Sequence, residues 1–484
     1  MWSVIYKYFA PSGAPALPET PIGLFLSINY PMPNLTQLRL AAREILDETL
    51  HAVDAGAALR RAVRLAGSQL HVCDTAVDIG SRNIYSIAIG KAAFTMAYAL
   101  EQILGDSFAA GFMSGPVLNP SLIGLEARQE FIPETRWRRC EGGHPLPNQT
   151  SLLAANESFD LLQRANEERA LIIFLISGGG SAMLEWPAND YITLADLRAA
   201  NKALVNCATS ISEINAVRRA FSAVKGGRLA ARAPDCDQIT LIISDVPSGE
   251  ERNVASGPTL LPSKDAPNAL EVIDRYDLRS QFPETILGAI ENDGAVPESK
   301  PTSSRRHFIL LDNQSTLEAA AAAARRRGYT TEVAADISDQ PIEEGCRQLV
   351  GRLNTLHDRV KTIESSETDT VCLISGGEFA CPVKGEGLGG RNLETALRLA
   401  NEPDLPNSFV GLCAGTDGID GNSPAAGAIV DNTTNARARA IGLDAPAFID
   451  RSDAYSFFVA LGDAITTGPT GTNVRDIRIL LATR

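Results

Sequence analysis

The amino-acid sequence predicts an α/β protein of two domains, each built on a mainly parallel sheet. Three observations support this fold class. The chain has 484 residues, which is more than one ordinary hydrophobic core accommodates. Short runs that are apolar throughout alternate with helical stretches, as expected for parallel strands that helices cover on both faces. A polar stretch that resembles a linker, residues 292–306, separates an earlier series of these units from a later one.

The first 33 residues differ in composition from the rest of the chain, with many prolines and aromatic side chains. Only Lys7 precedes the apolar run "GLFLSI", and prolines interrupt this region, so a secretory signal peptide fits poorly. We interpret residues 1–33 as a disordered extension or as an upstream, mis-assigned start, with Met32 as the alternative beginning.

The predicted N-terminal domain covers residues 34–300. Leucines at three- and four-residue steps predict a first helix, which either Asn34 or Thr36 can cap. Buried strands are then predicted in "IYSIAIG", "LIIFLIS" and "QITLIIS", and helical stretches follow the first two. These strands predict a parallel sheet.

The predicted C-terminal domain covers residues 301–484. Its strands are expected in "HFILLD", "TVCLISGG", "SFVGLCAGTDG" and "DIRILLA", with a helix rich in Ala and Arg at residues 315–327. The turn in "LISGG" repeats the one in "LISGGGSAML" of the first series, but no repeat of fixed period is present.

The charge and the cysteines exclude several classes of protein. The net charge is −14, from 44 basic and 58 acidic residues, and the basic runs are short, so a nucleic-acid partner is not expected. The eight cysteines form no CxxC pair or zinc-like spacing, which fits a reducing cytoplasm. No stretch reaches the ~18–20 apolar residues of a membrane span.

The glycine turn after "LIIFLI" is the first candidate for a ligand site, because ligands of parallel sheets bind beyond the carboxyl ends of the strands. Without Cβ atoms, Gly178, Gly179 and Gly180 allow successive N–H groups to form an anion nest, and Ser177 and Ser181 add hydroxyl donors. The alternative is a tight turn that needs glycine for steric reasons alone. The second glycine turn favours binding of a phosphate or a carboxylate.

Four polar residues follow predicted strands or lie in stiff loops. Lys91 comes directly after "IAIG", where it can neutralise a phosphoryl group, although a surface lysine is the alternative. His144 lies between Gly143 and Pro145, in a position that is either functional or structural. Asp245 and Asp417 follow strands, either as magnesium-binding carboxylates or as parts of Asx turns.

Several known phosphate-binding motifs are missing from the sequence. There is no GxxxxGK[ST] of a P-loop enzyme, no strand-linked GxGxxG of a dinucleotide-binding enzyme, and no protein-kinase signature.

Nine segments occur in an order that is typical of one family. They are "AIGKAA", "EGGHPLPN", "LISGGGSAML", "EINAVRRAFSAVKGGRLA", "ISDVPSGEERNVASGPT", "LISGGE", "GLGGRNLETAL", "AGTDGIDGNSPAAGAIVD" and "TTGPTGTNVRDIRILL". From about residue 84 to its end, the chain therefore resembles the glycerate 2-kinases, whose C-terminal part is called the MOFRL domain. Some members carry the name hydroxypyruvate reductase.

The resemblance implies a Rossmann-like N-terminal domain and a smaller MOFRL domain, with the active site in the cleft between them. It implies ATP- and Mg²⁺-dependent phosphorylation of D-glycerate at the 2-hydroxyl, giving 2-phosphoglycerate and ADP. The alternative is an NAD(P)H-dependent hydroxypyruvate reductase, which the missing dinucleotide motif argues against. The expected partners are D-glycerate and ATP, with no membrane partner, and a homodimer is left open.

The resemblance also implies roles for individual residues. Lys91 and Arg391 match the essential lysine and arginine of the family. The other matched residues are expected to contact ligands: ATP phosphates at Ser177, Gly178, Gly179, Gly180 and Ser181; glycerate at His144, Asp417 and Gly418; and magnesium at Asp245. Arg391 either clamps the glycerate carboxylate or stabilises the transition state. The proton acceptor stays open between a carboxylate and His144.

The chain departs from the family pattern at three places. Asn148 stands where members often have Asp, Ala220 where they often have His, and Ser248 to Glu250 where many have a Gly-Asp-Asp run. These departures leave the metal ligands and the preferred acceptor open.

Overall fold

The computed structural model describes residues 34–116, 136–207, 209–292, 303–361 and 370–483. The extension predicted at residues 1–33 and most of the predicted linker lie outside the described residues. Among the described residues, no helix combines the length and the apolar character needed to cross a bilayer.

The first sheet has six strands, all parallel, in the order β6-β5-β4-β7-β8-β9. The bounds of its strands are β4 (Ile84–Ile89), β5 (Phe108–Ser114), β6 (Trp137–Cys140), β7 (Leu171–Ser177), β8 (Asp237–Ile243) and β9 (Arg305–Leu311). Every residue of β4 and β7 is buried, which explains their continuous apolar runs. The chain runs outward from β4 through β5 to β6 and from β7 through β8 to β9, so the strand order reverses between β4 and β7.

Helices cover both faces of this sheet. One face packs against α2 (Ala55–Ala62) and α3 (Ala93–Leu104), and the other packs against α4 (Gln149–Glu167). Asn148, which departs from the family pattern, is the N-cap of α4, because its side chain accepts a hydrogen bond from the backbone N–H of Ser151.

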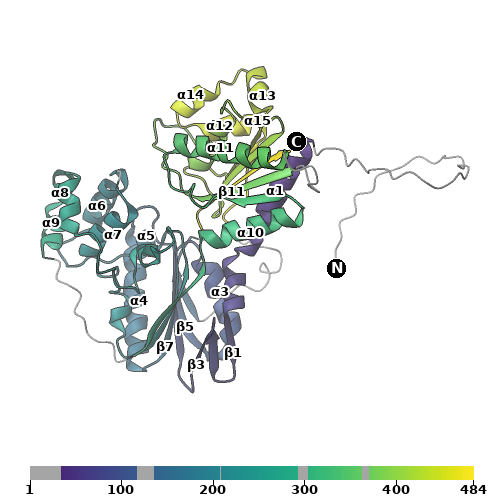
Figure 1. The fold of residues 1–484 in the computed structure, drawn as a ribbon. Coiled ribbons are helices and arrows are strands. Elements are labelled where there is room, and N and C mark those ends of the chain that lie inside the picture. Colours follow the sequence, from purple (N-terminus) through teal and green to yellow (C-terminus); the bar gives the residue numbers. More distant parts are fainter. Residues whose placement is uncertain (1–33, 117–135, 208, 293–302, 362–369, 484) are drawn as a thin grey trace, which may run out of the picture. The chain divides into compact units, whose positions relative to one another are not determined.

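Smaller elements complete this part of the chain. A three-stranded antiparallel sheet lies between α2 and β4 in the sequence, with strands β1 (Val63–Ala66), β2 (Gln69–Val72) and β3 (Thr75–Asp78). Figure 1 shows a helical group that comprises α6 (Leu194–Asn206), α7 (Ile211–Ala220), α8 (Ala269–Arg275) and α9 (Glu284–Glu291). Buried side chains of these helices form an apolar core of their own. The remaining short helices are η1 (Gly105–Ser107), α5 (Gly180–Met183), η3 (Ala230–Arg232), η4 (Glu251–Ser256) and η5 (Arg279–Gln281).

The second sheet also has six strands, in the order β10-β11-β15-β12-β13-β14. Their bounds are β10 (Thr330–Val333), β11 (Thr370–Gly377), β12 (Phe409–Gly415), β13 (Gly427–Asp431), β14 (Ala464–Ile465) and β15 (Asp476–Thr483). In the part of this sheet that the structure describes, β10 and β11 pair in parallel, whereas the other four neighbouring pairs are antiparallel. The prediction of a mainly parallel second sheet is therefore wrong. Burial of both faces makes a strand apolar throughout in either direction, so this pattern does not determine strand direction.

The second sheet is covered by helices on both faces. One face packs against a group that consists of α11 (Ile342–Lys361), α12 (Arg391–Leu399), α13 (Thr434–Ala440), α14 (Ala445–Asp450) and α15 (Ala454–Leu461). The other face packs against α10 (Asn313–Arg326) and α1 (Leu35–Ala52). Asn34 caps α1 as predicted, because its side chain accepts a hydrogen bond from the N–H of Gln37 at 3.0 Å.

The expected division into residues 34–300 and 301–484 stays a prediction, and two elements lie on the other side of it. Helix α1 packs on the second sheet, where Arg39 forms an ion pair with Asp431 at 2.6 Å. Strand β9 pairs with β8 as the edge of the first sheet. Neither placement is visible in the periodicity of the sequence, because that pattern gives the type of an element and not the sheet that it joins.

Candidate active site

The site begins where the strand order of the first sheet reverses, between β4 and β7. The loops after these two strands are joined by hydrogen bonds. The N–H of Lys91 donates to the carbonyl of Gly178 at 2.9 Å, and the N–H of Ala92 donates to Oγ of Ser177 at 3.0 Å. The Ser177 hydroxyl in turn donates to the carbonyl of Ile89 at 3.1 Å. Ser177 is fully buried, so its hydroxyl positions the Lys91 loop.

The three glycines of the first turn have different reasons to be glycine. A Cβ on Gly178 would collide with the carboxylate of Asp245, and a Cβ on Gly180 would stand 2.7 Å from Ile89 and 2.9 Å from Ala255. Gly179 adopts a left-handed conformation with φ of 79°. Gly178 and Gly180 are therefore needed for steric reasons, which was the alternative to ligand binding. Gly179 instead lies beside Lys91 and His144.

A cavity of about 800 Å³ lies beyond the ends of β4, β7 and β8. Five of the predicted site residues line it with Gly179: Lys91, His144, Asp245, Arg391 and Asp417. The other predicted residues, Ser177, Gly178, Gly180, Ser181 and Gly418, are not part of its lining. The hydroxyl of Ser181 instead lies 2.8 Å from that of Ser256.

Lys91 extends into the cavity and is paired with an acid of the second sheet. Its Nζ lies 2.5 Å from Oδ2 of Asp417, which follows β12. The Lys91 side chain is 27% exposed and that of Asp417 is 15% exposed. The other carboxylate oxygen of Asp417 accepts a hydrogen bond from the N–H of Ile419 at 3.2 Å. Lys91 therefore carries its charge inside a partly enclosed site, in contrast to a solvated surface lysine.

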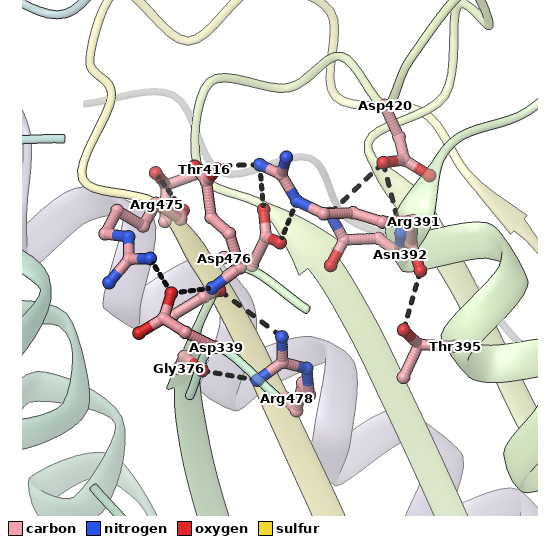
Figure 2. Close-up of polar contacts among 12 residues, drawn as sticks. Asp339, Gly376, Arg391, Asn392, Thr395, Thr416, Asp420, Arg475, Asp476 and Arg478 are labelled. Atoms are coloured by element: carbon pink, nitrogen blue, oxygen red, sulfur yellow. Dashed lines mark hydrogen bonds and ion pairs between the residues drawn. The ribbon is translucent and has the colours of Figure 1, made fainter. Parts of the chain in front are cut away.

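Arg391 is the first residue of α12, and two acids hold its guanidinium. Figure 2 shows one of them, Asp476. Asp476 at the start of β15 accepts from Nε at 2.5 Å and from Nη2 at 3.3 Å. Nη2 also lies 2.8 Å from Oε1 of Glu378. Burial opposes the charge, but the fields of Asp476 and Glu378 raise the pKa of Arg391, so the guanidinium stays protonated.

The start of α12 is fixed by Asp420, whose oxygens accept hydrogen bonds from the N–H groups of Asn392 at 3.1 Å and Leu393 at 2.8 Å (Figure 2). Burial raises the pKa of Asp420 to about 7, against the effect of these hydrogen bonds. Thr395 adds a hydrogen bond from its hydroxyl to the carbonyl of Arg391 at 2.6 Å. These contacts orient Arg391.

Asp245 follows β8 and faces the same cavity. Nδ2 of Asn473 donates to its Oδ2 at 3.3 Å. Burial raises the pKa of the Asp245 carboxyl, and the field of Lys91 opposes this rise. Among the residues that the structure describes, no group of three His, Cys, Asp or Glu side chains could hold a metal ion.

His144 lines the cavity next to Gly179 and Lys91. Burial lowers the pKa of its imidazole to about 4. The charges of Lys91 and Arg218 add to this decrease, and the charge of Asp417 opposes it. The ring is therefore neutral at pH 7.

The second glycine turn, Ser375 to Gly377, has a structural role. The buried side chain of Arg478 donates to the carbonyl of Gly376 and, at 3.3 Å, to that of Gly377. The N–H of Gly377 donates to Oδ1 of Asn313 at 2.9 Å. Because protein groups already bind this turn, it does not support the argument that two similar turns indicate two ligand sites.

The two acids of the cavity that hold Arg391, Glu378 and Asp476, are among the lining residues that were not predicted from the sequence. Glu378 directly follows the turn in "LISGG", as Asp245 follows the end of β8, so its position after a strand could have indicated it. Asp476 begins the apolar run of β15 and carries no such signal.

The chain is similar to known families and proteins over most of its length. The model described as "Domain of unknown function (DUF4147)" matches residues 41–291, and that of the MOFRL family matches residues 371–476. A glycerate 2-kinase of Pyrococcus horikoshii is 32% identical over 92% of this chain and 98% of its own length. A putative hydroxypyruvate reductase of Agrobacterium vitis is 35% identical over 82% of this chain and 98% of its own length. The crystal structure of a glycerate kinase from Thermotoga maritima has a TM-score of 0.71 at 28% identity and covers 92% of this chain and 99% of its own.

Proposed function

Because the chain belongs to the glycerate 2-kinase family, we propose that it transfers the γ-phosphoryl group of ATP to the 2-hydroxyl of D-glycerate, giving 2-phosphoglycerate and ADP. One observation supports this function most directly. Lys91, which follows β4 of the first sheet, and Arg391, which begins a helix over the second sheet, line the same cavity.

The charges of the cavity suit a phosphoryl transfer between two anionic substrates. Such a reaction needs positioning of the groups and neutralisation of charge more than covalent chemistry by the protein. The chain as a whole carries a net charge of −14, so cations inside the cavity are needed to attract ATP and glycerate. Lys91 and Arg391 supply these two charges.

Lys91 stabilises the phosphoryl group during its transfer. Asp417 holds the ammonium group in place through the 2.5 Å ion pair. Phosphoryl oxygens compete with Asp417 for this cation, and the additional charge that they carry in the transition state strengthens their interaction with Lys91.

Arg391 was expected either to clamp the glycerate carboxylate or to stabilise the transition state. Its geometry favours stabilisation of the transition state. A bidentate carboxylate clamp needs two parallel N–H donors. Nε and Nη2 already bind Asp476, and Nη2 also contacts Glu378. A clamp on glycerate would have to replace one of these acids, so we assign Arg391 to the stabilisation of the transferred phosphoryl group.

In this proposal, Gly179 is the residue of the first glycine turn that contacts ATP. Gly179 is the residue of that turn that lines the cavity, and its left-handed conformation beside Lys91 is typical of a backbone anion nest. His144 and Asp417 line the same cavity and remain the proposed contacts of glycerate.

Asp245 is the residue proposed to hold Mg²⁺. A carboxylate oxygen that faces the cavity is a ligand of the type that this ion prefers, and Mg²⁺ is usually held by one or two carboxylates together with substrate phosphates. When bound, the ion would supply positive charge to the phosphate oxygens of ATP.

A cytoplasmic location is part of the proposal, together with small molecules as the only substrates. All eight cysteines are free thiols, which is usual in a reducing compartment.

The proposal is tested by incubating the purified protein with ATP, Mg²⁺ and D-glycerate and identifying the product by ³¹P and ¹³C NMR. We expect 2-phosphoglycerate and ADP. Formation of 3-phosphoglycerate would retain the kinase and overturn the orientation of the substrate. Oxidation of NADH with hydroxypyruvate, without formation of ADP, would instead indicate the reductase.

A further inference from the structure

We infer that Glu378 is the group that accepts the proton of the glycerate hydroxyl when this oxygen attacks the γ-phosphorus of ATP. The inference rests on the proposed function and names a residue for the proton-transfer step.

Glu378 lies where a proton acceptor is needed. It directly follows β11 and lines the cavity with Lys91, Asp245 and Arg391. Its side chain is 32% exposed, so a substrate can reach it. Its Oε1 lies 2.8 Å from Nη2 of Arg391, and its Oε2 accepts no hydrogen bond from the described residues. One carboxylate oxygen is therefore fixed by Arg391 and the other is available.

The backbone that carries Glu378 is held from several sides. Arg478 binds the carbonyls of Gly376 and Gly377, and its guanidinium stacks 3.5 Å above the ring of Phe379. The N–H of Glu378 itself donates to Oδ1 of Asp339 at 3.3 Å. Figure 2 shows Arg478 and Asp339 beneath the Arg391–Asp476 pair. A carboxylate on such a rigid turn can be held in one orientation toward a substrate.

Four other carboxylates that line the cavity have partners within the chain. Both oxygens of Asp476 bind Arg391, and those of Asp420 bind the N-terminus of α12. Asp417 forms the short ion pair with Lys91. Asp245 accepts from Asn473 and is the proposed magnesium residue.

The basicity of the candidates gives a second argument. Burial raises the pKa of Glu378 to about 7, Asp476 and Asp245 add to the rise, and Arg391 and Arg475 oppose it. Asp339 is the further acid that faces its backbone. A general base works best when its pKa is close to the working pH. His144, with a pKa of about 4, is the weaker base of the two.

The proposed step balances in atoms and charge. The hydroxyl oxygen of glycerate forms a bond to the γ-phosphorus, and the bond from that phosphorus to the β,γ-bridging oxygen breaks, so ADP leaves with the electron pair. The hydroxyl proton passes to Glu378, which later releases it to solvent. No oxidant or further reactant is required.

The test compares Glu378→Gln, Glu378→Asp and the control Glu402→Gln with the unchanged protein. Glu402 is a partly exposed glutamate of the same half of the chain, also with a raised pKa, and it lies outside the cavity lining. For each protein, kcat and KM for D-glycerate are measured from pH 5.5 to 9 at saturating ATP and Mg²⁺, and folding is checked by thermal unfolding.

We expect E378Q to lower kcat by about 100- to 10,000-fold with little change in KM, as is typical for loss of a general base. The acidic limb of the pH–rate profile should disappear in E378Q, return at a displaced pH in E378D, and be unchanged in E402Q. If E378Q does not fold, the assignment is tested by the displacement of the acidic limb of the pH–rate profile in E378D.

An E378Q protein with a normal kcat, or with the acidic limb intact, would overturn the assignment, as would a limb in E378D at the unchanged pH. A loss confined to KM would also overturn it, because an effect on KM alone indicates a role in binding glycerate and not in proton transfer. If the unchanged protein makes no phosphoglycerate, the proposed function fails instead, so the two failures are distinguishable.

Discussion

Lys91 and Arg391 are cations that the structure places in one cavity although they are 300 residues apart in the chain (391 − 91). Sequence reasoning alone could place Lys91 at the end of a strand, but not opposite an arginine of the other sheet. Arg391 was predicted only from the family motif, because no periodicity distinguishes it from other arginines at the start of a helix.

Replacement of Lys91 or Arg391 by Ala is expected to lower kcat by about 100- to 1,000-fold, because each removes a charge that stabilises the transferred phosphoryl group. Lys202→Ala is the matched control, since Lys202 is exposed and lies outside this cavity. A coupled assay of ADP release measures the effect. Equal rates for K91A and K202A would contradict the assignment of Lys91.

Ser177 shows how a hydroxyl in a ligand-binding motif can serve the fold. Its side chain bonds the backbone of Ile89 and Ala92 inside the core. We expect Ser177→Ala to lower the free energy of unfolding by about 1–3 kcal/mol, because the N–H of Ala92 would lose its partner without access to water. Urea unfolding measures this loss. A protein of unchanged stability but with a strongly raised KM for ATP would instead support the predicted contact with phosphate.

The titration of Glu378 links its chemistry to stability. Its pKa is raised from 4.5 to about 7 in the folded chain, so between these values the folded protein binds more protons than the unfolded one. The stability that Glu378 contributes is therefore greatest below pH 4.5 and decreases as the pH rises to about 7.

We expect the difference in unfolding free energy between E378Q and the unchanged protein to move in favour of E378Q as the pH rises from about 5 to 8. Urea unfolding at several pH values measures this difference. A constant difference would show that the carboxyl has the same pKa in the folded and unfolded chains.

At the scale of elements, the sequence predicts the first sheet well and the second less well. The apolar runs of β4, β7 and β8 were each identified, and their parallel pairing follows from the helices between them. In the second sheet, β15 is the last strand of the chain but lies between β11 and β12, antiparallel to both. The pairing of a strand with partners distant in sequence depends on tertiary contacts, which local patterns do not contain.

Helix α1 offers a direct test of its packing on the second sheet. Ile45 is fully buried in the core that α1 shares with β12 and β15, whereas Leu40 of the same helix is 57% exposed. We expect Ile45→Ala to lower the unfolding free energy by about 2–5 kcal/mol, because it leaves a cavity in a close-packed core. Leu40→Ala should change it by less than about 0.5 kcal/mol. Similar losses for the two variants in urea unfolding would contradict this placement.

At the scale of the whole molecule, the two sheets do not follow the order of the chain. The chain begins its described part on the second sheet with α1, builds the first sheet as far as β9, and then returns to the second with α10. Strand β9, which follows the predicted linker in the sequence, is thus part of the first sheet.

Hydrogen exchange of the intact protein should follow the sheets. We expect the amides of α1 to be protected together with those of β11 and β12, because they share one core, and those of β9 with the first sheet. Mass spectrometry of peptic fragments at increasing denaturant concentration measures the protection of each of these elements. Loss of protection in α1 together with β7, at a denaturant concentration where β11 remains protected, would contradict the arrangement.

The ion pairs of the cavity have a consequence for selectivity. Both cations already have a carboxylate partner within the chain, Asp417 for Lys91 and Asp476 for Arg391. A ligand must therefore outcompete an anion that is tethered at high local concentration. Chloride and other monovalent ions of the cell are weak rivals of such a carboxylate, whereas a polyphosphate has several charged oxygens with which to replace it. At these two cations, the built-in acids therefore favour the polyphosphate of ATP over monovalent anions.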